Sequence, residues 1–255
     1  MLPIAGRICV IGVLALLMSV GIVAAPGQKP PDVEALLGRL DDLYRSKSSI
    51  ARLQIVVTSP RLTRTMRMKA WTRGEEEVLV LIEAPPREAG TATLRVGKNL
   101  WNYLPRIARV IRVPPSMMLG SWMGTDFTND DLVKESSLHK DFTARIDRRS
   151  DTPPGWWLAL DVKAGVVGRW ARIDLLVSDD DLPVEERYFD RKGRLARTMK
   201  FDDVKMLGGR RLPAHLLLTP ADTEGQRTEM HYLELQFDVA IPADMFSLTR
   251  IEHIE

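Results

Sequence analysis

The stretch that decides the fold is Leu62–Trp71, which reads Leu-Thr-Arg-Thr-Met-Arg-Met-Lys-Ala-Trp. Its residues alternate in character, so that Met66, Met68 and Ala70 fall on one face and Trp71 falls on the other. A period of two is typical of a β-strand with one buried face. The stretch therefore predicts a strand that presents Met66 and Met68 together.

The same pattern extends along most of the chain. A continuous apolar run at Val78–Ile82 follows, and further strand-like segments recur at intervals of roughly ten residues. Turn signals such as Gly97-Lys98-Asn99 and Gly208-Gly209 separate many of them, which favours a long antiparallel meander. The later predicted strands are 91–96, 100–104, 108–113, 143–147, 156–162, 171–177, 184–190, 196–204, 211–218 and 228–237.

A sheet of this size needs a cover. Ten or more strands must curl, and a closed barrel of that size leaves more interior than side chains fill. Three segments are candidates to cover the concave face: a helix over Val33–Tyr44 capped by Asp32, the segment Pro114–Leu132, and a helical turn within Pro242–Leu248.

The segment Pro114–Phe127 is too rich in Pro and Gly for a regular strand. Methionine is flexible and polarizable, so a loop rich in it can adapt to apolar partners of variable shape. The segment is either a lid that contacts an apolar ligand or a plug for one end of the sheet core. Its candidate lid residues are Met117, Met118, Leu119, Trp122 and Met123.

Residues 1–25 have the three parts of a secretory signal. Arg7 precedes an uncharged apolar run from Ile8 to Ala25 that ends in small residues. We expect a cleaved signal peptide at 1–25 and one mature domain at 26–255, with a retained membrane anchor as the alternative. The only cysteine, Cys9, lies in the run, so the mature domain has no disulfide, thiolate metal site or cysteine nucleophile.

Charge composition argues against a nucleic-acid partner. Of the 36 basic residues Arg7 lies in the leader, which leaves 35 basic residues against 34 acidic ones. Nucleic-acid binding needs a strongly basic face, and this balance does not supply one.

No catalytic or metal-binding motif is visible. The histidines His139, His215, His231 and His253 have no metal-ligand spacing and are interpreted as ordinary surface residues. Ser121 lacks the Gly-x-Ser-x-Gly order of a nucleophile elbow, and there is no phosphate-binding loop. We therefore expect no enzyme, metal or cofactor, although carboxylates from distant strands could still assemble a hydrolase site.

Several segments in order resemble one known family. They are the exported leader, the opening helix, Gly90–Pro105, Val110–Pro115, Ser121–Phe127 and Phe246 after the last strand. The chain resembles the outer-membrane lipoprotein-sorting proteins of the LolA-like lipoprotein-carrier superfamily. The resemblance covers essentially the mature chain and is most specific in Gly90–Val133.

The resemblance implies a mainly β fold with a few helices (α+β): one curved antiparallel sheet in an unclosed β-barrel, with a helical and loop lid over an apolar cavity. It implies a monomeric carrier in the periplasm of a Gram-negative bacterium that shields acyl chains of a lipoprotein or free lipid. An inner-membrane exporter and an outer-membrane acceptor would be its partners, with a resistance-nodulation-class lipid exporter as another system it could serve.

The candidate acyl-binding residues join the lid to the sheet. Besides the five lid residues they are Met66, Met68, Leu94, Val96, Trp101 and Tyr103, for which plain core packing is the competing interpretation. A second functional hypothesis is an envelope sensor or adaptor on the same fold that binds a partner protein.

Overall fold

We describe residues 29–133, 138–166 and 168–254 of a computed structural model. The expected signal peptide, 1–25, lies outside these residues. Everything described below belongs to one compact unit, Pro31–Glu255.

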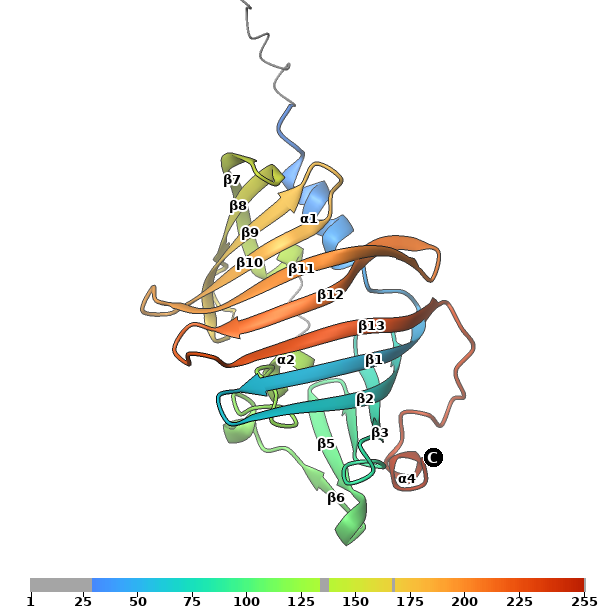
Figure 1. The fold of residues 1–255 in the computed structure, drawn as a ribbon. Coiled ribbons are helices and arrows are strands. Elements are labelled where there is room, and N and C mark those ends of the chain that lie inside the picture. The colour runs from blue at the N-terminus through green and yellow to red at the C-terminus, as the bar shows by residue number, and fades with distance from the viewer. Residues whose placement is uncertain (1–28, 134–137, 167, 255) are drawn as a thin grey trace, which may run out of the picture. The chain divides into compact units, whose positions relative to one another are not determined.

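Thirteen strands form one sheet with short helices beside it (Figure 1). The strands are β1 (Ser48–Ser59), β2 (Leu62–Arg73), β3 (Glu77–Ala84), β4 (Ala92–Val96), β5 (Asn99–Leu104), β6 (Arg109–Arg112), β7 (Phe142–Asp151), β8 (Pro154–Val162), β9 (Trp170–Ser178), β10 (Pro183–Asp190), β11 (Leu195–Leu207), β12 (Arg210–Pro220) and β13 (Arg227–Phe237). The helices are α1 (Val33–Asp41), α2 (Asn129–Val133), α3 (Leu138–Asp141) and α4 (Leu248–Glu252), with 3-10 turns at Pro105–Ile107 and Pro115–Met117.

The sheet is antiparallel and is not closed into a barrel. Its strand order is β6-β5-β4-β3-β2-β1-β13-β12-β11-β10-β9-β8-β7, so β6 and β7 are its two edges. Strands that follow one another in the chain are neighbours, except that β6 and β7 lie at opposite edges. The β1–β13 pair brings the first strand beside the last. The predicted fold class, a mainly β unclosed sheet with few helices, is confirmed.

The sheet consists of two half-sheets that are weakly joined. β13 pairs with β1 from Arg227 to Phe237, and β12 pairs with β11 from Arg210 to Pro220. Between them, β12 and β13 pair only over His215–Leu218 and Thr228–His231. We call this four-pair ladder the seam, the group β13 and β1–β6 half-sheet A, and the group β7–β12 half-sheet B.

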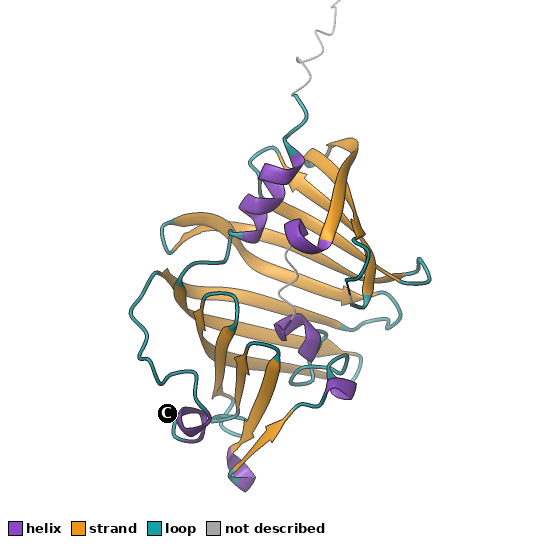
Figure 2. Cartoon of the chain, turned by 180° about the vertical axis from the view of Figure 1, so that it is seen from behind, coloured by secondary structure: helices purple, strands orange, loops and turns teal. Residues whose placement is uncertain are grey.

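Two of the three expected covers lie on one face of the sheet, which we call the inner face (Figure 2). Helix α1 places Leu36, Leu37 and Leu40 in a core with half-sheet B. The segment 114–133 places Trp122 in a second core, against Met66 and Met68 of half-sheet A. The expected pairing of Met66 with Met68, opposite Trp71, is confirmed by this packing.

The third expected cover lies on the other side. Met245, Phe246 and Ile251 pack against Trp71 and Leu79 on the outer face of half-sheet A. The prediction that the C-terminal segment covers the concave face is therefore wrong. Strand β3 is apolar on both faces, and this segment buries the outer one.

The opening helix is shorter than predicted. It begins after Asp32, whose carboxylate accepts a hydrogen bond from the Ala35 amide, and it ends at Asp41 rather than Tyr44. Beyond the helix, the Tyr44 hydroxyl donates a 2.7 Å hydrogen bond to the Pro213 carbonyl of β12, in the region where β12 has no β13 partner. This bond links the residue that follows α1 to half-sheet B.

Candidate functional site

A cavity of about 350 Å³ lies on the inner face, where the two cores meet above the seam. Half-sheet B, half-sheet A and both covers contribute to it. Its lining is Leu40, Leu43, Tyr44, Trp122, Phe127, Asp131, Leu132, Leu138, Trp170, Pro183, Glu186, Tyr188, Arg197, Met199, Phe201, Leu216, Met230 and Tyr232.

Most of the cavity wall is apolar and aromatic. Phe127 packs against both cores, and Tyr44 stacks on Tyr232 with ring centroids 5.2 Å apart. Burial raises the pKa of the Tyr44 hydroxyl, with smaller contributions from Tyr232 and Glu186, so the phenol stays neutral. A wall of this kind favours hydrocarbon over polar solutes.

One ion pair is buried at the cavity wall. Arg197 of β11 donates two hydrogen bonds to the Asp131 carboxylate of α2, at 2.8 and 2.9 Å, and the Arg197 side chain is only 8% exposed. The guanidinium lies 4.5 Å from the Trp170 ring and 4.4 Å from the Tyr188 ring. Burial alone would raise the pKa of Asp131, but the charge and hydrogen bonds of Arg197 hold it below its usual value.

A second acid faces the same cavity without a cationic partner in hydrogen-bond contact. The Tyr188 hydroxyl donates a hydrogen bond to the Glu186 carboxyl, and both groups are buried. Burial raises the pKa of Glu186, against the lowering effects of the Tyr188 hydrogen bond and the Arg197 charge. Burial thus shifts the protonation equilibrium of Glu186 toward the neutral carboxyl, which lowers the net charge in the cavity.

Polar contacts from four strands hold the segment 114–133 in place. Arg64 of β2 donates to the Met123 carbonyl, Trp122 donates from Nε1 to Thr93 of β4 at 3.0 Å, and Arg95 donates to the Leu132 carbonyl at 3.1 Å. Further bonds join Asp126 to Thr228 of β13, and Arg197 of β11 binds Asp131. The segment is thus fastened to both half-sheets.

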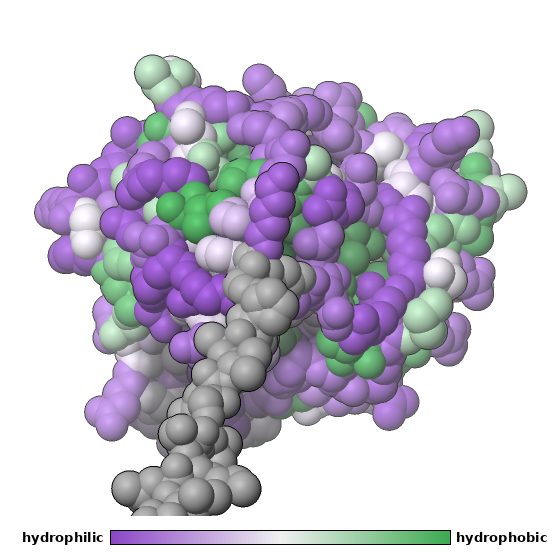
Figure 3. Space-filling model, turned by 90° about the horizontal axis from the view of Figure 1, so that it is seen from above, coloured by the Kyte–Doolittle hydropathy of each residue, from purple (hydrophilic) through white to green (hydrophobic). Residues whose placement is uncertain are grey.

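The face of the molecule seen in Figure 3 is mostly polar. Hydrophilic residues cover most of that face, and apolar residues show in the recesses between them. Within residues 29–133, 138–166 and 168–254, no helix combines the length and the hydropathy needed to cross a bilayer.

Comparison with known proteins agrees with this architecture. A family model described as "Uncharacterized protein" matches residues 74–253. The chain belongs to that family. No curated protein sequence matches the chain.

Three solved structures share the fold. A DUF1329 family protein from Desulfovibrio piger has a TM-score of 0.76 and 20% identity, over 86% of this chain and 97% of its own. A putative outer membrane lipoprotein-sorting protein domain from Vibrio parahaemolyticus has a TM-score of 0.72 and 20% identity, over 86% and 96%. A LolA superfamily protein from Nitrosomonas europaea has a TM-score of 0.70 and 19% identity, over 85% and 97%. The fold expected from the sequence resemblance is confirmed.

The structure divides the sequence-predicted site residues into three groups. Trp122 lines the cavity, and Met66, Met68 and Met123 pack with it in the core of half-sheet A. The strand residues Leu94, Val96, Trp101 and Tyr103 lie in the outer-face cluster, under the C-terminal segment. They are therefore not part of the cavity wall.

The remaining lid residues lie away from the cavity. Met117 and Leu119 are exposed, and Met118 is half-buried outside the cavity lining. Only the Trp122 end of the methionine-rich segment reaches the inner cores. The outer end presents Met117 and Leu119 to solvent.

Sequence reasoning missed the polar wall of the cavity. Arg197, Met199 and Phe201 alternate along β11, so an arginine shares a face with two apolar residues, and this was a readable signal. Glu186 and Tyr188 repeat the pattern in β10. A charge on an apolar strand face marks either a buried pair or a functional group.

Proposed function

We propose that this chain is a periplasmic carrier that shields the acyl chains of a lipoprotein or lipid between the inner and outer membranes. The observation that carries the proposal is the apolar cavity above the seam, enclosed by two half-sheets and two separate covers. The likeness to the Vibrio parahaemolyticus structure, a putative outer membrane lipoprotein-sorting protein domain of the same fold, supports it.

The physical need for such a carrier follows from the cost of exposing hydrocarbon to water. Each methylene of an acyl chain contributes about 0.8 kcal/mol to membrane binding, so a cargo with two or three chains leaves a membrane only into an equally apolar site. Aromatic and aliphatic side chains such as Tyr232, Phe201 and Met230 provide that environment. An exporter in the inner membrane and an acceptor at the outer membrane would load and unload it.

The cavity must enlarge to hold such a cargo. Its volume, about 350 Å³, is near the lower end of the roughly 300–1,000 Å³ of ligand sites. The seam joins the half-sheets by four residue pairs, whereas β1 and β13 pair along ten. We therefore propose that cargo enters as half-sheets A and B separate beyond the seam.

The polar groups of the cavity support a binding role without catalysis. Arg197 and Asp131 are committed to each other in a two-bond ion pair, and Glu186 is bonded to Tyr188. In this arrangement the described residues place no serine, cysteine or histidine beside a base within the cavity wall. We propose that these groups hold the covers in place and keep net charge out of the cavity.

The first test is mass spectrometry of organic extracts from protein purified from a Gram-negative periplasm without detergent. A lipid or acyl-peptide in near one-to-one ratio is the expected result. Protein that is folded, empty, and unable to take up a fluorescent fatty acid would reject the carrier and favour the sensor that binds a partner protein.

A matched pair of variants tests the place of binding. Met230→Trp fills the cavity from β13, whereas Leu233→Trp adds the same ring at an exposed position of the same strand, where the native side chain is 49% exposed. We expect Met230→Trp to weaken fluorescent fatty-acid binding at least tenfold and Leu233→Trp to leave it unchanged. Equal binding by both variants would move the acyl site elsewhere.

A further inference from the structure

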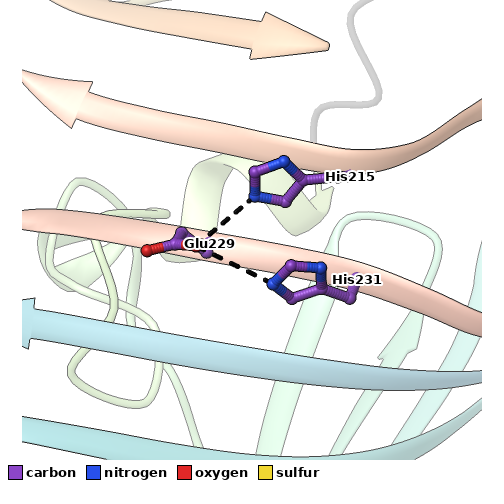
Figure 4. A group of neighbouring side chains, drawn as sticks. All are labelled: His215, Glu229 and His231. Carbon is purple, nitrogen blue, oxygen red and sulfur yellow. Dashed lines mark ion pairs between the residues drawn. The ribbon is translucent and has the colours of Figure 1, made fainter. Parts of the chain in front are cut away.

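Three side chains from β12 and β13 meet on the outer face of the seam, opposite the cavity. His215 of β12 pairs directly with His231 of β13, and their rings stack with centroids 4.4 Å apart. Glu229 lies beside both: its Oε2 is 3.5 Å from His215 Nε2 and 3.8 Å from His231 Nε2 (Figure 4). All three side chains are partly buried.

Neighbouring residues orient two of these three groups. An Asp202 carboxylate oxygen lies 2.6 Å from His215 Nδ1, and a carboxylate can only accept, so Nδ1 carries a proton and the neutral ring has its lone pair on Nε2. Arg227 Nε donates at 3.0 Å to the other oxygen of Glu229. The ring and the carboxylate are thus fixed with His215 Nε2 and Glu229 Oε2 turned toward each other.

Two hydrogen-bond acceptor atoms face each other in this arrangement. His215 Nε2 is buried and has no hydrogen-bond partner among the described residues. It faces a carboxylate oxygen, so two electron-pair donors lie 3.5 Å apart with no positive group between them. Buried acceptors in this position call for a cation.

The spacing fits a transition-metal ion. Zinc bonds of about 2.0–2.2 Å to nitrogen and oxygen place tetrahedral ligands roughly 3.4 Å apart, close to the 3.5 and 3.8 Å observed. Two imidazoles and one carboxylate, with the remaining position open to water, form a familiar ligand set for such ions. The Asp202 contact is the second carboxylate that metal-bound histidines commonly carry.

We propose that His215, Glu229 and His231 form a zinc-binding site that joins β12 to β13 at the end of the seam. His215 and His231 form the last pair of the ladder, beyond which the two strands have no further pairing. The ion would link the half-sheets where they begin to part. On binding, the His231 ring turns about its Cβ–Cγ bond so that its lone pair meets that of His215 at one ion.

Metal at this position has a mechanical consequence, which rests on the proposed carrier function. An ion held by both β12 and β13 opposes separation of the half-sheets, so zinc should slow acyl-chain entry into the cavity. The metal site itself is independent of the cargo. It can therefore be tested in protein that carries no lipid.

The experiment is calorimetric titration of Zn²⁺ into EDTA-stripped protein. We expect one ion per chain, at least 100-fold weaker binding in His231→Ala, and 10–100-fold weaker binding in Asp202→Asn, which leaves all three ligands in place. His253→Ala is the matched control, because His253 is exposed and lies outside the cluster. Its affinity should equal that of the unaltered protein.

Two further measurements separate a lost site from a lost fold. Thermal melts without metal should give similar Tm values for all variants, whereas added Zn²⁺ should raise Tm only where the site is intact. Co²⁺ bound to the unaltered protein should show the visible absorption of a low-symmetry site with nitrogen ligands. No binding at 1 mM Zn²⁺, or equal binding by His231→Ala and His253→Ala, would overturn the proposal. A proton between His215 and Glu229 would then be the alternative to a metal ion.

Discussion

The two half-sheets bury their side chains differently. Half-sheet A is covered on both faces: Val80 and Ile82 of β3 face the segment 114–133, while Leu79 and Leu81 face the C-terminal segment. Half-sheet B has an apolar inner face under α1 and carries ion pairs such as Arg145–Asp161. A strand buried on both faces has a continuous apolar sequence, and one with a single buried face alternates. The contrast between β3 and β7 follows from this rule.

The inner covers also differ in how they are held. Helix α1 is held mainly by Leu36, Leu37 and Leu40, with an exposed ion pair from Arg39 to Asp181. The segment 114–133 has one fully buried apolar anchor, Trp122, and many polar ones, and one of the polar partners, Arg197, belongs to half-sheet B. That ion pair ties the cover of half-sheet A to the other half.

The largest expected effect comes from removing this tie. Arg197→Met leaves the buried Asp131 carboxylate with hydrogen bonds from Thr128 but without its cationic partner, which should lower the free energy of unfolding by about 3–5 kcal/mol. Denaturant titration measures the loss. The double variant Asp131→Asn with Arg197→Met should recover much of it, because no unpaired charge remains. A single-variant loss below about 1 kcal/mol would mean that the ion pair does not hold the segment.

The next effect tests the outer cover that only half-sheet A has. Phe246 is 8% exposed and packs on the outer-face cluster beside the Arg73 guanidinium. Phe246→Ala should cost about 3 kcal/mol of stability by loss of buried surface and cavity formation. Leu248→Ala, at an exposed neighbouring position, is the control. Equal effects of the two changes would show that the C-terminal segment is not a structural cover.

The outer face of half-sheet A also shows what local sequence patterns cannot predict. Local alternation identified the strands, and it placed Met66 and Met68 opposite Trp71. It could not show that the apolar face of β4, with Leu94, lies under the C-terminal segment, while the polar face with Thr93 and Arg95 contacts the segment 114–133. That arrangement depends on Met245 and Phe246, which lie some 140 residues later in the chain. Hence Leu94 and Trp101 were expected at the cavity and lie on the outer face.

A smaller effect, and one that depends on pH, is expected on the inner face of half-sheet B. The folded protein raises the pKa of Glu186 above its unfolded value of about 4.3, so it binds the proton more tightly than the unfolded chain does. Stability is therefore lost as pH rises from about 4 through the raised pKa. Glu186→Gln should remove that loss, and unfolding titrations at pH 4 and pH 7 measure it.

The direction of the pH effect is diagnostic. The variant should match the unaltered protein near pH 4 and be more stable at pH 7, since glutamine is neutral and can still accept the Tyr188 hydrogen bond. A variant less stable at pH 7 would indicate that the ionised carboxylate contributes to the fold through Arg197.

The smallest effect is expected on the outer face of half-sheet B. Arg145 and Asp161 are paired there, but both side chains are more than half exposed. Arg145→Ala should change stability by no more than about 0.5 kcal/mol, since exposed ion pairs contribute little. A thermal melt is sufficient to check it. A loss comparable to that of Phe246→Ala would show that this face is covered in solution.

The seam explains why one site escaped sequence analysis. His215 and His231 are 16 residues apart in the chain, and no short motif links them. They meet because β12 and β13 form a hairpin about the turn near Thr223, which sets the pairing of 215 with 231 and of 218 with 228. Counting outward from that turn would have paired them. Asp202 lies on β11, so its position beside His215 depends in addition on the register between β11 and β12.

The β1–β13 pair also governs how the chain folds. Strands β7–β12 pair with neighbours in sequence, so half-sheet B can assemble from local hairpins as soon as those residues are available. Strands β1–β6 can do the same, but half-sheet A is complete only when Arg227–Phe237 arrives to pair with β1, and such high contact order slows folding. Until then β1 is an open edge, able to pair with another chain. A chain that emerges from its N-terminus would therefore depend on β13 to protect β1 from aggregation.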